Sequence, residues 1–315
     1  MPLIIPENLP ARDLLEEENI FVMNEKRAFT QDIRPIHVAI VNLMPKKEET
    51  ELQFLRLLSN TPLQVEVDLI RTESYESKNT DIRHLEQFYK TFSQIKNKKY
   101  DAMIITGAPV ELIKFEEILY WDELKEILDY AKTHVYSTMF VCWAAQAALY
   151  HYYKVPKRSQ DEKIFGVFDY SVLTKNLLTK GFDDVFYTPQ SRHTFTCKSD
   201  LEKIENIDVI AERPDTGVHL AATKDCRFVF VAGHWEYDPH TLENEYLRDK
   251  SQGLEIDVPI NYYINDDDTK GINVRWRSHG NLFFYNWLNE VYQSTPYDVD
   301  SIEEKIVMKK SCAAQ

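Results

Sequence analysis

Residues 135–149 constrain this chain more than any other stretch, because a strand there leads directly into a helix. The first half is rich in β-branched and aromatic residues, and the second half is rich in alanine, the strongest helix former. Cys142 lies at the change of direction. A thiol at that point meets the positive end of a helix dipole and unpaired backbone N–H groups, which favour a thiolate and an oxyanion. The pattern indicates a nucleophile, and a small buried hydrophobic residue is the alternative.

Further strands and helices alternate along the first half of the chain. The nearly continuous apolar runs at 37–44 and 100–105 are typical of strands buried on both faces of a parallel sheet. Residues 65–70 alternate between apolar and charged, which predicts an edge or half-exposed strand. Helical spacing of apolar residues follows at 48–58 and 120–131. We therefore expect an α/β fold with a mostly parallel central sheet flanked by helices.

The second half of the chain carries the same kinds of signal. Short strands are predicted at 164–168, 209–211 and 219–222, a stronger strand at 227–233, and helices at about 241–250 and 279–292. The composition of residues 188–194, Thr-Pro-Gln-Ser-Arg-His-Thr, predicts a loop. Because no internal repeat or Gly/Ser-rich linker interrupts the sequence, we expect an N-terminal arm (1–35), one catalytic domain (36–296) and a polar C-terminal tail (297–315).

Composition excludes several functions. The net charge of −14 argues against nucleic acid and against an anionic membrane surface, since both bind clustered Lys and Arg. The chain has no run of membrane-spanning length, and its N-terminus lacks a signal-peptide pattern. Its cysteines form no closely spaced pair, so we expect no metal site, no disulfide framework and a cytoplasmic protein; they are Cys142, Cys197, Cys226 and Cys312.

His234 and Glu236 follow directly after the predicted strand 227–233. If the backbone stays extended, period-two alternation places both side chains on one side, where Glu236 can accept a hydrogen bond from His234. Cys142 also follows a strand, and ligands bind at the carboxyl ends of strands in an open parallel sheet. A Cys-His-Glu set at that edge suits acyl-enzyme chemistry, with an ordinary polar pair at a strand end as the alternative.

Five short motifs together resemble a known family. They are Asn-Leu-Met-Pro-Lys-Lys at 42–47, Thr-Gly-Ala-Pro at 106–109, Cys-Trp-Ala-Ala-Gln at 142–146, Pro-Gln-Ser-Arg at 189–192 and Gly-His-Trp-Glu-Tyr at 233–237. The C-x-x-x-Q elbow with a later H-x-E resembles the class I glutamine amidotransferase-like fold, which is flavodoxin-like. The whole set resembles the homoserine O-acyltransferase family of methionine biosynthesis, from the N-terminal arm to about residue 296.

The resemblance implies a role for each matching residue. Cys142 would form the acyl thioester, His234 would be the general base and Glu236 its orienting partner. The residues that would contact the substrate L-homoserine are Lys163, Ser191 and Arg248. The oxyanion and coenzyme A region would comprise Gly107, Ala108, Trp143, Lys46 and Lys47. Without the family, the charged residues are more simply explained as solvated surface groups, and Ser191 as a turn former. The resemblance also implies a homodimer.

Glu111 bears on the acyl donor. In the resembled family, the second residue after the Thr-Gly-Ala-Pro turn is glycine in succinyltransferases and glutamate in acetyltransferases, and this chain has Glu111. A fixed carboxylate there would repel the distal carboxylate of a succinyl group. We therefore expect a homoserine O-acetyltransferase that uses acetyl-CoA as co-substrate, by a ping-pong mechanism and without a bound cofactor. A solvated Glu111 and use of succinyl-CoA are the alternatives.

Two other functions remain open at this point. A glutamine-hydrolysing amidotransferase or another cysteine hydrolase on the same fold would release ammonia from glutamine or hydrolyse its acyl-enzyme. A noncatalytic binding protein that kept the fold would not release coenzyme A, and it is disfavoured because all three residues of the Cys-His-Glu set are present. An α/β-hydrolase is disfavoured because the sequence lacks its G-x-S-x-G motif.

Overall fold

The computed structural model describes residues 3–6, 8–18, 22–23, 34–75 and 79–303. Its strands are β1 (Leu3–Ile4), β2 (Val22–Met23), β3 (Ile36–Val41), β4 (Val65–Arg71), β5 (Tyr89–Thr91), β6 (Tyr100–Ile105), β7 (Val135–Val141), β8 (Arg158–Val172), β9 (Val185–Phe195), β10 (Ile207–Arg213), β11 (Gly217–Thr223) and β12 (Phe228–Val231). Its α-helices are α1 (Ala11–Glu17), α3 (Lys47–Leu58), α4 (Ile82–Phe88), α5 (Phe92–Ile95), α6 (Trp121–His134), α7 (Trp143–Tyr153), α8 (Lys198–Leu201), α9 (Thr241–Ser251) and α10 (Arg277–Ser294).

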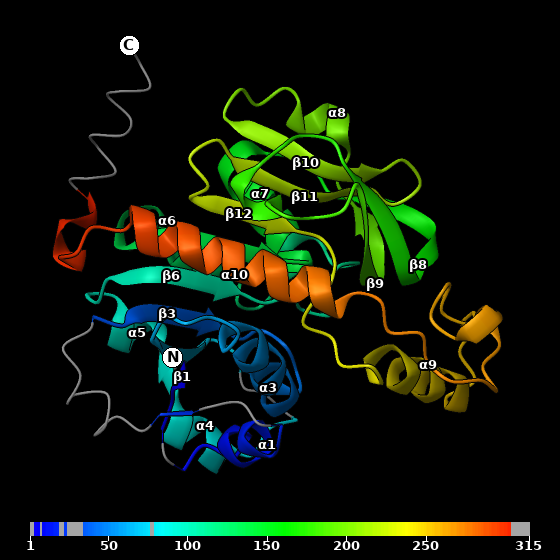
Figure 1. The fold of residues 1–315 in the computed structure, drawn as a ribbon, viewed down its shortest axis with the longest axis horizontal. Helices are drawn as coiled ribbons and strands as arrows, with labels where there is room; N and C mark the ends of the chain where they lie inside the picture. The colour runs from blue at the N-terminus through cyan, green and yellow to red at the C-terminus, as the bar shows by residue number, and fades with distance from the viewer. Residues whose placement is uncertain (1–2, 7, 19–21, 24–33, 76–78, 304–315) are drawn as a thin grey trace.

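One sheet runs through the molecule in the order β2-β1-β4-β3-β6-β7-β12-β11-β10-β8-β9, and β5 pairs with β4 outside this path. The strands from β2 to β12 pair in parallel, whereas the pairs from β12 through β11, β10 and β8 to β9 are antiparallel. Helices flank the sheet, with α10 crossing its near face (Figure 1). The predicted mostly parallel α/β architecture is confirmed.

Both faces of the central strands are covered. Along β3, Val38 and Ile40 belong to the hydrophobic cluster that includes α3 and α10, whereas Ala39 and Val41 belong to the cluster that includes α6 and α7. All four side chains are fully buried. A strand enclosed in this way needs apolar residues at every position, which explains why its sequence is a continuous apolar run.

Of the two positions predicted for residues 65–70, the half-exposed one is confirmed, and β4 is not an edge strand. Leu3 and Ile4 of the N-terminal arm pair with the start of β4, and β5 pairs with its end. These added strands are only two or three residues long, so Glu66 and Asp68 remain partly accessible to solvent. The alternating pattern therefore records partial exposure of one face and gives no information about position in the sheet.

The predicted loop at 188–194 is also wrong, because these residues lie within β9. Their polar side chains alternate inward and are buried at Thr188, Gln190, Arg192 and Thr194. The Arg192 guanidinium donates to Gln190 Oε1 at 2.9 Å and to the carbonyl oxygens of Thr194 and Thr216 at 2.6 and 2.7 Å. Pro189 is tolerated because β9 is the last strand of the sheet.

The boundaries predicted for the arm, the catalytic domain and the tail stay predictions. Parts of the arm (1–35) and of the tail (297–315), including Cys312, lie outside the described residues. Cys142, Cys197 and Cys226 carry free thiols. Among the helices of the described segments, none combines the length and the apolar character that crossing a membrane requires.

Candidate active site

Cys142 occupies a strained turn between β7 and α7. Its backbone angles are φ 52° and ψ −116°, which L-residues other than glycine rarely adopt. Such a conformation costs about 1–3 kcal/mol and persists only when its surroundings hold it. Here the Cys142 N–H donates to the carbonyl of Val231 in β12 at 2.7 Å. The thiol consequently lies at the N-terminus of α7, where the sequence pattern predicted it.

The turn after β6 lies directly against this nucleophile elbow. A Cβ added to Gly107 would come within 3.2 Å of the Cys142 Cβ and 3.7 Å of His234 Cε1. The approach to Cys142 is tighter than ordinary Cβ contacts, whereas that to His234 is an ordinary van der Waals contact, so a side chain at Gly107 would crowd the nucleophile. Ala108 follows and is buried. Trp143 begins α7, and the first N–H groups of a helix have no acceptor within it. The predicted oxyanion donors, which are the backbone N–H groups of Trp143 and Ala108, therefore belong to the two segments that meet at Cys142.

His234 and Glu236 form the predicted pair, but the predicted extended backbone is wrong, because residues 235–236 form a turn in which the Tyr237 N–H donates to the carbonyl of His234 at 3.3 Å. Both side chains are buried, and His234 Nδ1 lies 2.6 Å from Glu236 Oε1. Because Nδ1 faces Glu236, the other ring nitrogen, Nε2, is left for Cys142, whose side chain is close enough to contribute to the raised pKa of His234. The backbone N–H of His234 donates to the carbonyl of Pro189 in β9 at 2.9 Å, and the Tyr237 ring stacks on the imidazole with centroids 4.2 Å apart. The structure therefore brings all three residues of the Cys-His-Glu set into contact.

Two opposing effects determine the protonation of His234. Burial disfavours the imidazolium, but the charges of Glu236 and Cys142 and the hydrogen bonds to both outweigh it and raise the pKa of His234 to about 10. The raised pKa means that the imidazole is protonated near neutral pH. When the sulfur loses its charge, part of the stabilisation of the imidazolium disappears, and the pKa of His234 falls. This coupling lets one residue act first as an acid and then as a base.

The three residues assigned to substrate by resemblance meet at a fourth residue, Glu245. Lys163 Nζ from β8 and Ser191 Oγ from β9 donate to Glu245 Oε1 at 2.5 and 2.7 Å. Arg248, one turn further along α9, has an Nη2 4.0 Å from the same oxygen and pairs with Asp249 at 2.6 Å. Two cations, one hydroxyl and two carboxylates are thus gathered in one place.

This cluster adjoins the Cys-His-Glu set. Burial first, and then the negative charges of Glu245 and Glu236, raise the pKa of Tyr237, whose ring covers His234. Tyr237 therefore lies within electrostatic reach of both carboxylates. Glu245 was missed in the sequence, although it lies three residues before Arg248 on the predicted helix 241–250, which places both side chains on one helical face.

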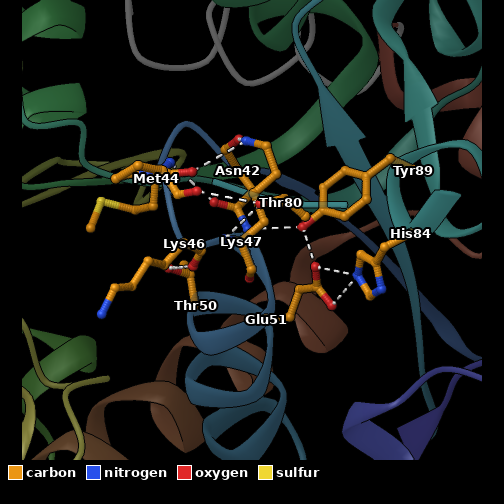
Figure 2. A network of polar contacts seen from close by, with 10 residues as sticks. Asn42, Met44, Lys46, Lys47, Thr50, Glu51, Thr80, His84 and Tyr89 are labelled. Atoms are coloured by element: carbon orange, nitrogen blue, oxygen red, sulfur yellow. Dashed lines mark hydrogen bonds and ion pairs between the residues drawn. The ribbon is translucent and has the colours of Figure 1, made fainter. Parts of the chain in front are cut away.

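Lys46 and Lys47 do not form a pair of surface cations. Strand β3 ends at Val41, and Lys47 begins α3 with its side chain buried. Its ammonium donates to the carbonyl of Asn42 at 2.5 Å and to that of Met44 at 3.3 Å, and burial lowers the pKa of Lys47 to about 8. Lys46 is exposed and its side chain points away from this network (Figure 2). Of the two lysines, only Lys46 remains available for a phosphate group.

A buried polar network surrounds Lys47. Tyr89 donates its hydroxyl hydrogen to Glu51 Oε1 at 2.5 Å and accepts a hydrogen bond from Asn42 Nδ2 at 2.9 Å (Figure 2). His84 Nε2 lies 3.0 Å from the same Glu51 oxygen. These contacts hold the loop after β3 in place, so the buried Lys47 stabilises the edge of the sheet and does not present its charge to solvent.

Glu111 lies in the turn that follows β6, four residues after Gly107, and its side chain is half-buried. It does not begin a helix, because the next α-helix, α6, starts at Trp121. Within the part of the chain that the structure describes, no group of three or more His, Cys, Asp or Glu side chains is arranged to hold a metal ion.

Comparison with known proteins identifies the family. The family model described as homoserine O-succinyltransferase matches residues 2–297. The chain belongs to this family. Members similar to it include homoserine O-acetyltransferases of Clostridium beijerinckii, 55% identical over 304 residues, and of Bacteroides thetaiotaomicron, 53% identical over 305 residues; each alignment covers 96% of this chain and 100% of the relative. A homoserine O-succinyltransferase of Vibrio vulnificus is 52% identical over 311 residues, with 98% and 99% covered.

Solved structures of other proteins share the fold of this homoserine O-succinyltransferase family member. A glutamine amidotransferase from Thermotoga maritima matches with a TM-score of 0.56 at 9% identity, covering 83% of this chain and 100% of that one. A glutamine amidotransferase from Methylobacillus flagellatus matches with a TM-score of 0.51 at 9% identity, covering 82% and 96%. Identities this low bear on the fold alone, and the predicted class I glutamine amidotransferase-like fold is confirmed.

Proposed function

We propose that this protein is a homoserine O-acetyltransferase, which transfers the acetyl group of acetyl-CoA to the hydroxyl of L-homoserine through a thioester on Cys142. The observation that carries the proposal is the contact between a strained Cys142 at a helix N-terminus and a buried His234 that is paired with Glu236. Membership of the family and relatives named homoserine O-acetyltransferase support it. The product would supply methionine biosynthesis, and we propose a cytoplasmic homodimer without a bound cofactor.

In the first half-reaction, the Cys142 thiolate attacks the thioester carbonyl of acetyl-CoA. The negative charge that develops on the carbonyl oxygen is stabilised by backbone N–H groups at Trp143 and Ala108. When the tetrahedral intermediate collapses, the bond to the coenzyme A sulfur breaks. His234 gives its proton to that sulfur, so coenzyme A leaves as a neutral thiol and the imidazole becomes neutral. The acetyl group remains on Cys142.

In the second half-reaction, the neutral His234 acts as a base. It removes the proton from the homoserine hydroxyl as the oxygen attacks the acetyl carbon of the thioester. O-acetyl-L-homoserine leaves, and the thiolate of Cys142 and the imidazolium of His234 are restored. The loss of the sulfur charge on acylation favours this step, because the charge of Cys142 is one of the causes that keep His234 protonated.

The cluster around Glu245 suits the zwitterionic head of homoserine. The guanidinium of Arg248 and the ammonium of Lys163 would bind the α-carboxylate, since a guanidinium can hold both carboxylate oxygens. Glu245, which accepts hydrogen bonds from Lys163 and Ser191, would accept a hydrogen bond from the α-ammonium. Together these groups would recognise an amino acid by its two charges, and the hydroxyl would point toward His234.

We expect Glu245→Gln to raise KM for homoserine roughly 10- to 100-fold, because a hydrogen bond to a charged group contributes about 1.5–3 kcal/mol. Formation of the acetyl-enzyme from acetyl-CoA should proceed as in the wild type. Steady-state kinetics with each substrate varied in turn would measure both effects. Glu243→Gln is the matched control, since Glu243 lies on the same helix but pairs with His240 at the surface. An unchanged KM for homoserine in Glu245→Gln would contradict this assignment.

Glu111 supports acetyl-CoA as the donor. Its carboxylate, carried by the turn after β6 that begins with Gly107 against Cys142, would repel the distal carboxylate of a succinyl group, whereas an acetyl group carries no charge to repel. We therefore expect kcat/KM for acetyl-CoA to exceed that for succinyl-CoA by at least about tenfold at a fixed homoserine concentration, as like charges in an enclosed site cost several kcal/mol. A preference for succinyl-CoA would make the protein a succinyltransferase and leave the roles of Cys142, His234 and Glu236 unchanged.

A further inference from the structure

The turn that carries Glu111 is tied to a lysine 46 residues further along the chain. The turn is closed by a hydrogen bond from the Ile113 N–H to the carbonyl of Val110 at 3.1 Å. Lys157 Nζ donates to the carbonyl oxygens of both Glu111 and Ile113 at 2.5 Å. A single ammonium group therefore holds two of the four residues of the turn, including the backbone of Glu111 itself.

The tip of this turn has little other support. Val110 packs against the hydrophobic core at the start of the turn, but the side chains of Leu112 and Ile113 are 69% and 42% exposed, so hydrophobic burial does not hold the tip in place. Lys114 is also exposed, and its ammonium pairs with Glu117 at 3.7 Å. At the tip, the charged hydrogen bonds of Lys157 are therefore a direct restraint on the backbone of Glu111, in addition to the packing of Val110 and the hydrogen bond that closes the turn.

Lys157 is itself fixed relative to the nucleophile. Its ammonium lies 4.5 Å from the centre of the Phe115 ring, and burial lowers the pKa of Lys157, an effect that the carboxylates of Glu111 and Glu116 oppose. The Phe115 ring is buried and stacks on Tyr150 of α7, the helix whose first turn follows Cys142. The lysine therefore connects the Glu111 turn to the helix that positions the thiol.

We propose that Lys157 is a positioning residue that fixes Glu111 and is thereby a second determinant of acyl-donor choice. The inference rests on the proposed function, in which the Glu111 carboxylate disfavours succinyl-CoA. Repulsion of this kind selects between donors only if the carboxylate cannot move away when a second negative charge enters. In this turn, the pair of hydrogen bonds from Lys157 opposes such a movement by holding the backbone of Glu111 directly.

A double-mutant cycle tests the proposal. The ratio of kcat/KM for acetyl-CoA to that for succinyl-CoA is measured in the wild type, Lys157→Met, Glu111→Gly and the double variant. We expect Lys157→Met to lower this ratio about tenfold when Glu111 is present and to leave it unchanged in the Glu111→Gly background, since residues that act through one another are coupled in such a cycle. Lys157→Arg should keep the wild-type ratio because a guanidinium can also donate to both carbonyls.

Controls separate this proposal from others. Lys114→Met removes an exposed ammonium from the same turn and should leave the donor ratio unchanged. If Lys157→Met does not fold, Lys157→Gln is measured in its place. An equal loss of activity with both donors, or the same change of ratio in both Glu111 backgrounds, would overturn the proposal. Acetylation of Cys142 by acetyl-CoA alone is measured in every variant, so its absence from the wild type would instead indicate failure of the proposed function.

Discussion

Cys142→Ala is expected to lower kcat by at least about 10⁴-fold, the scale of loss that follows removal of a catalytic nucleophile. The reason is that no other described group at the site can carry the acetyl group between the two substrates. The backbone turn should survive, because its geometry depends on contacts of the main chain such as the Cys142 N–H to the carbonyl of Val231. Release of coenzyme A with homoserine present is the measurement.

The matched control is Cys197→Ala. Cys197 is also a free thiol and also precedes a helix, α8, but it follows the outermost strand of the sheet and has no contact with His234 among the described interactions. Activity of this variant should equal that of the wild type. If Cys142→Ala keeps more than a few per cent of the wild-type rate, acyl transfer does not pass through this thiol.

Glu236→Gln is expected to lower kcat about 10³- to 10⁴-fold, as loss of the carboxylate that orients a catalytic histidine does. The amide can turn its N–H₂ toward His234 Nδ1, which stabilises the tautomer with its hydrogen on Nε2 and blocks proton removal there. Stopped assays at saturating substrate would measure the change. Glu66→Gln, which affects a surface pair with His37 at 3.5 Å, should leave kcat unchanged.

Glu236→Gln should also change how the free energy of unfolding depends on pH. The pKa of His234 is about 10 in the folded chain and about 6.5 when unfolded, so the stabilisation of its imidazolium is fully present below pH 6.5 and is lost as the pH rises toward 10. Glu236→Gln removes one cause of that raised pKa. The difference in the free energy of unfolding between wild type and variant should therefore be largest near pH 6 and shrink toward pH 10. Urea titrations across this range would measure it, and a difference that grows with pH would contradict the assigned charge on His234.

The nucleophile elbow could be predicted from the sequence because local preferences and tertiary structure agree there. The residues before Cys142 favour a strand, the residues after it favour a helix, and both elements are found. The H-x-E pair at His234 and Glu236 was predictable for a similar reason, since it follows the apolar strand β12 closely. Short-range patterns therefore predicted the positions of Cys142, His234 and Glu236, and the parallel sheet brings these residues to one edge.

Other parts depended on interactions between distant residues. The polar residues of β9 predicted a loop. In the structure the Arg192 side chain is buried, and its guanidinium donates to the carbonyl oxygens of Thr194 and of Thr216 on a neighbouring segment. Glu245 had no motif of its own, and its importance appears only when β8 and β9 bring Lys163 and Ser191 to α9. No local pattern encodes partners that lie more than 50 residues away.

The central claim is that Cys142 carries the acetyl group, and one measurement tests it directly. The protein is incubated with acetyl-CoA in the absence of homoserine, and its mass and the masses of its peptides are then determined. We expect one added acetyl group, located on the peptide that contains Cys142, and its removal as O-acetyl-L-homoserine when homoserine is added. An unmodified Cys142 in protein that is active with both substrates would contradict the account.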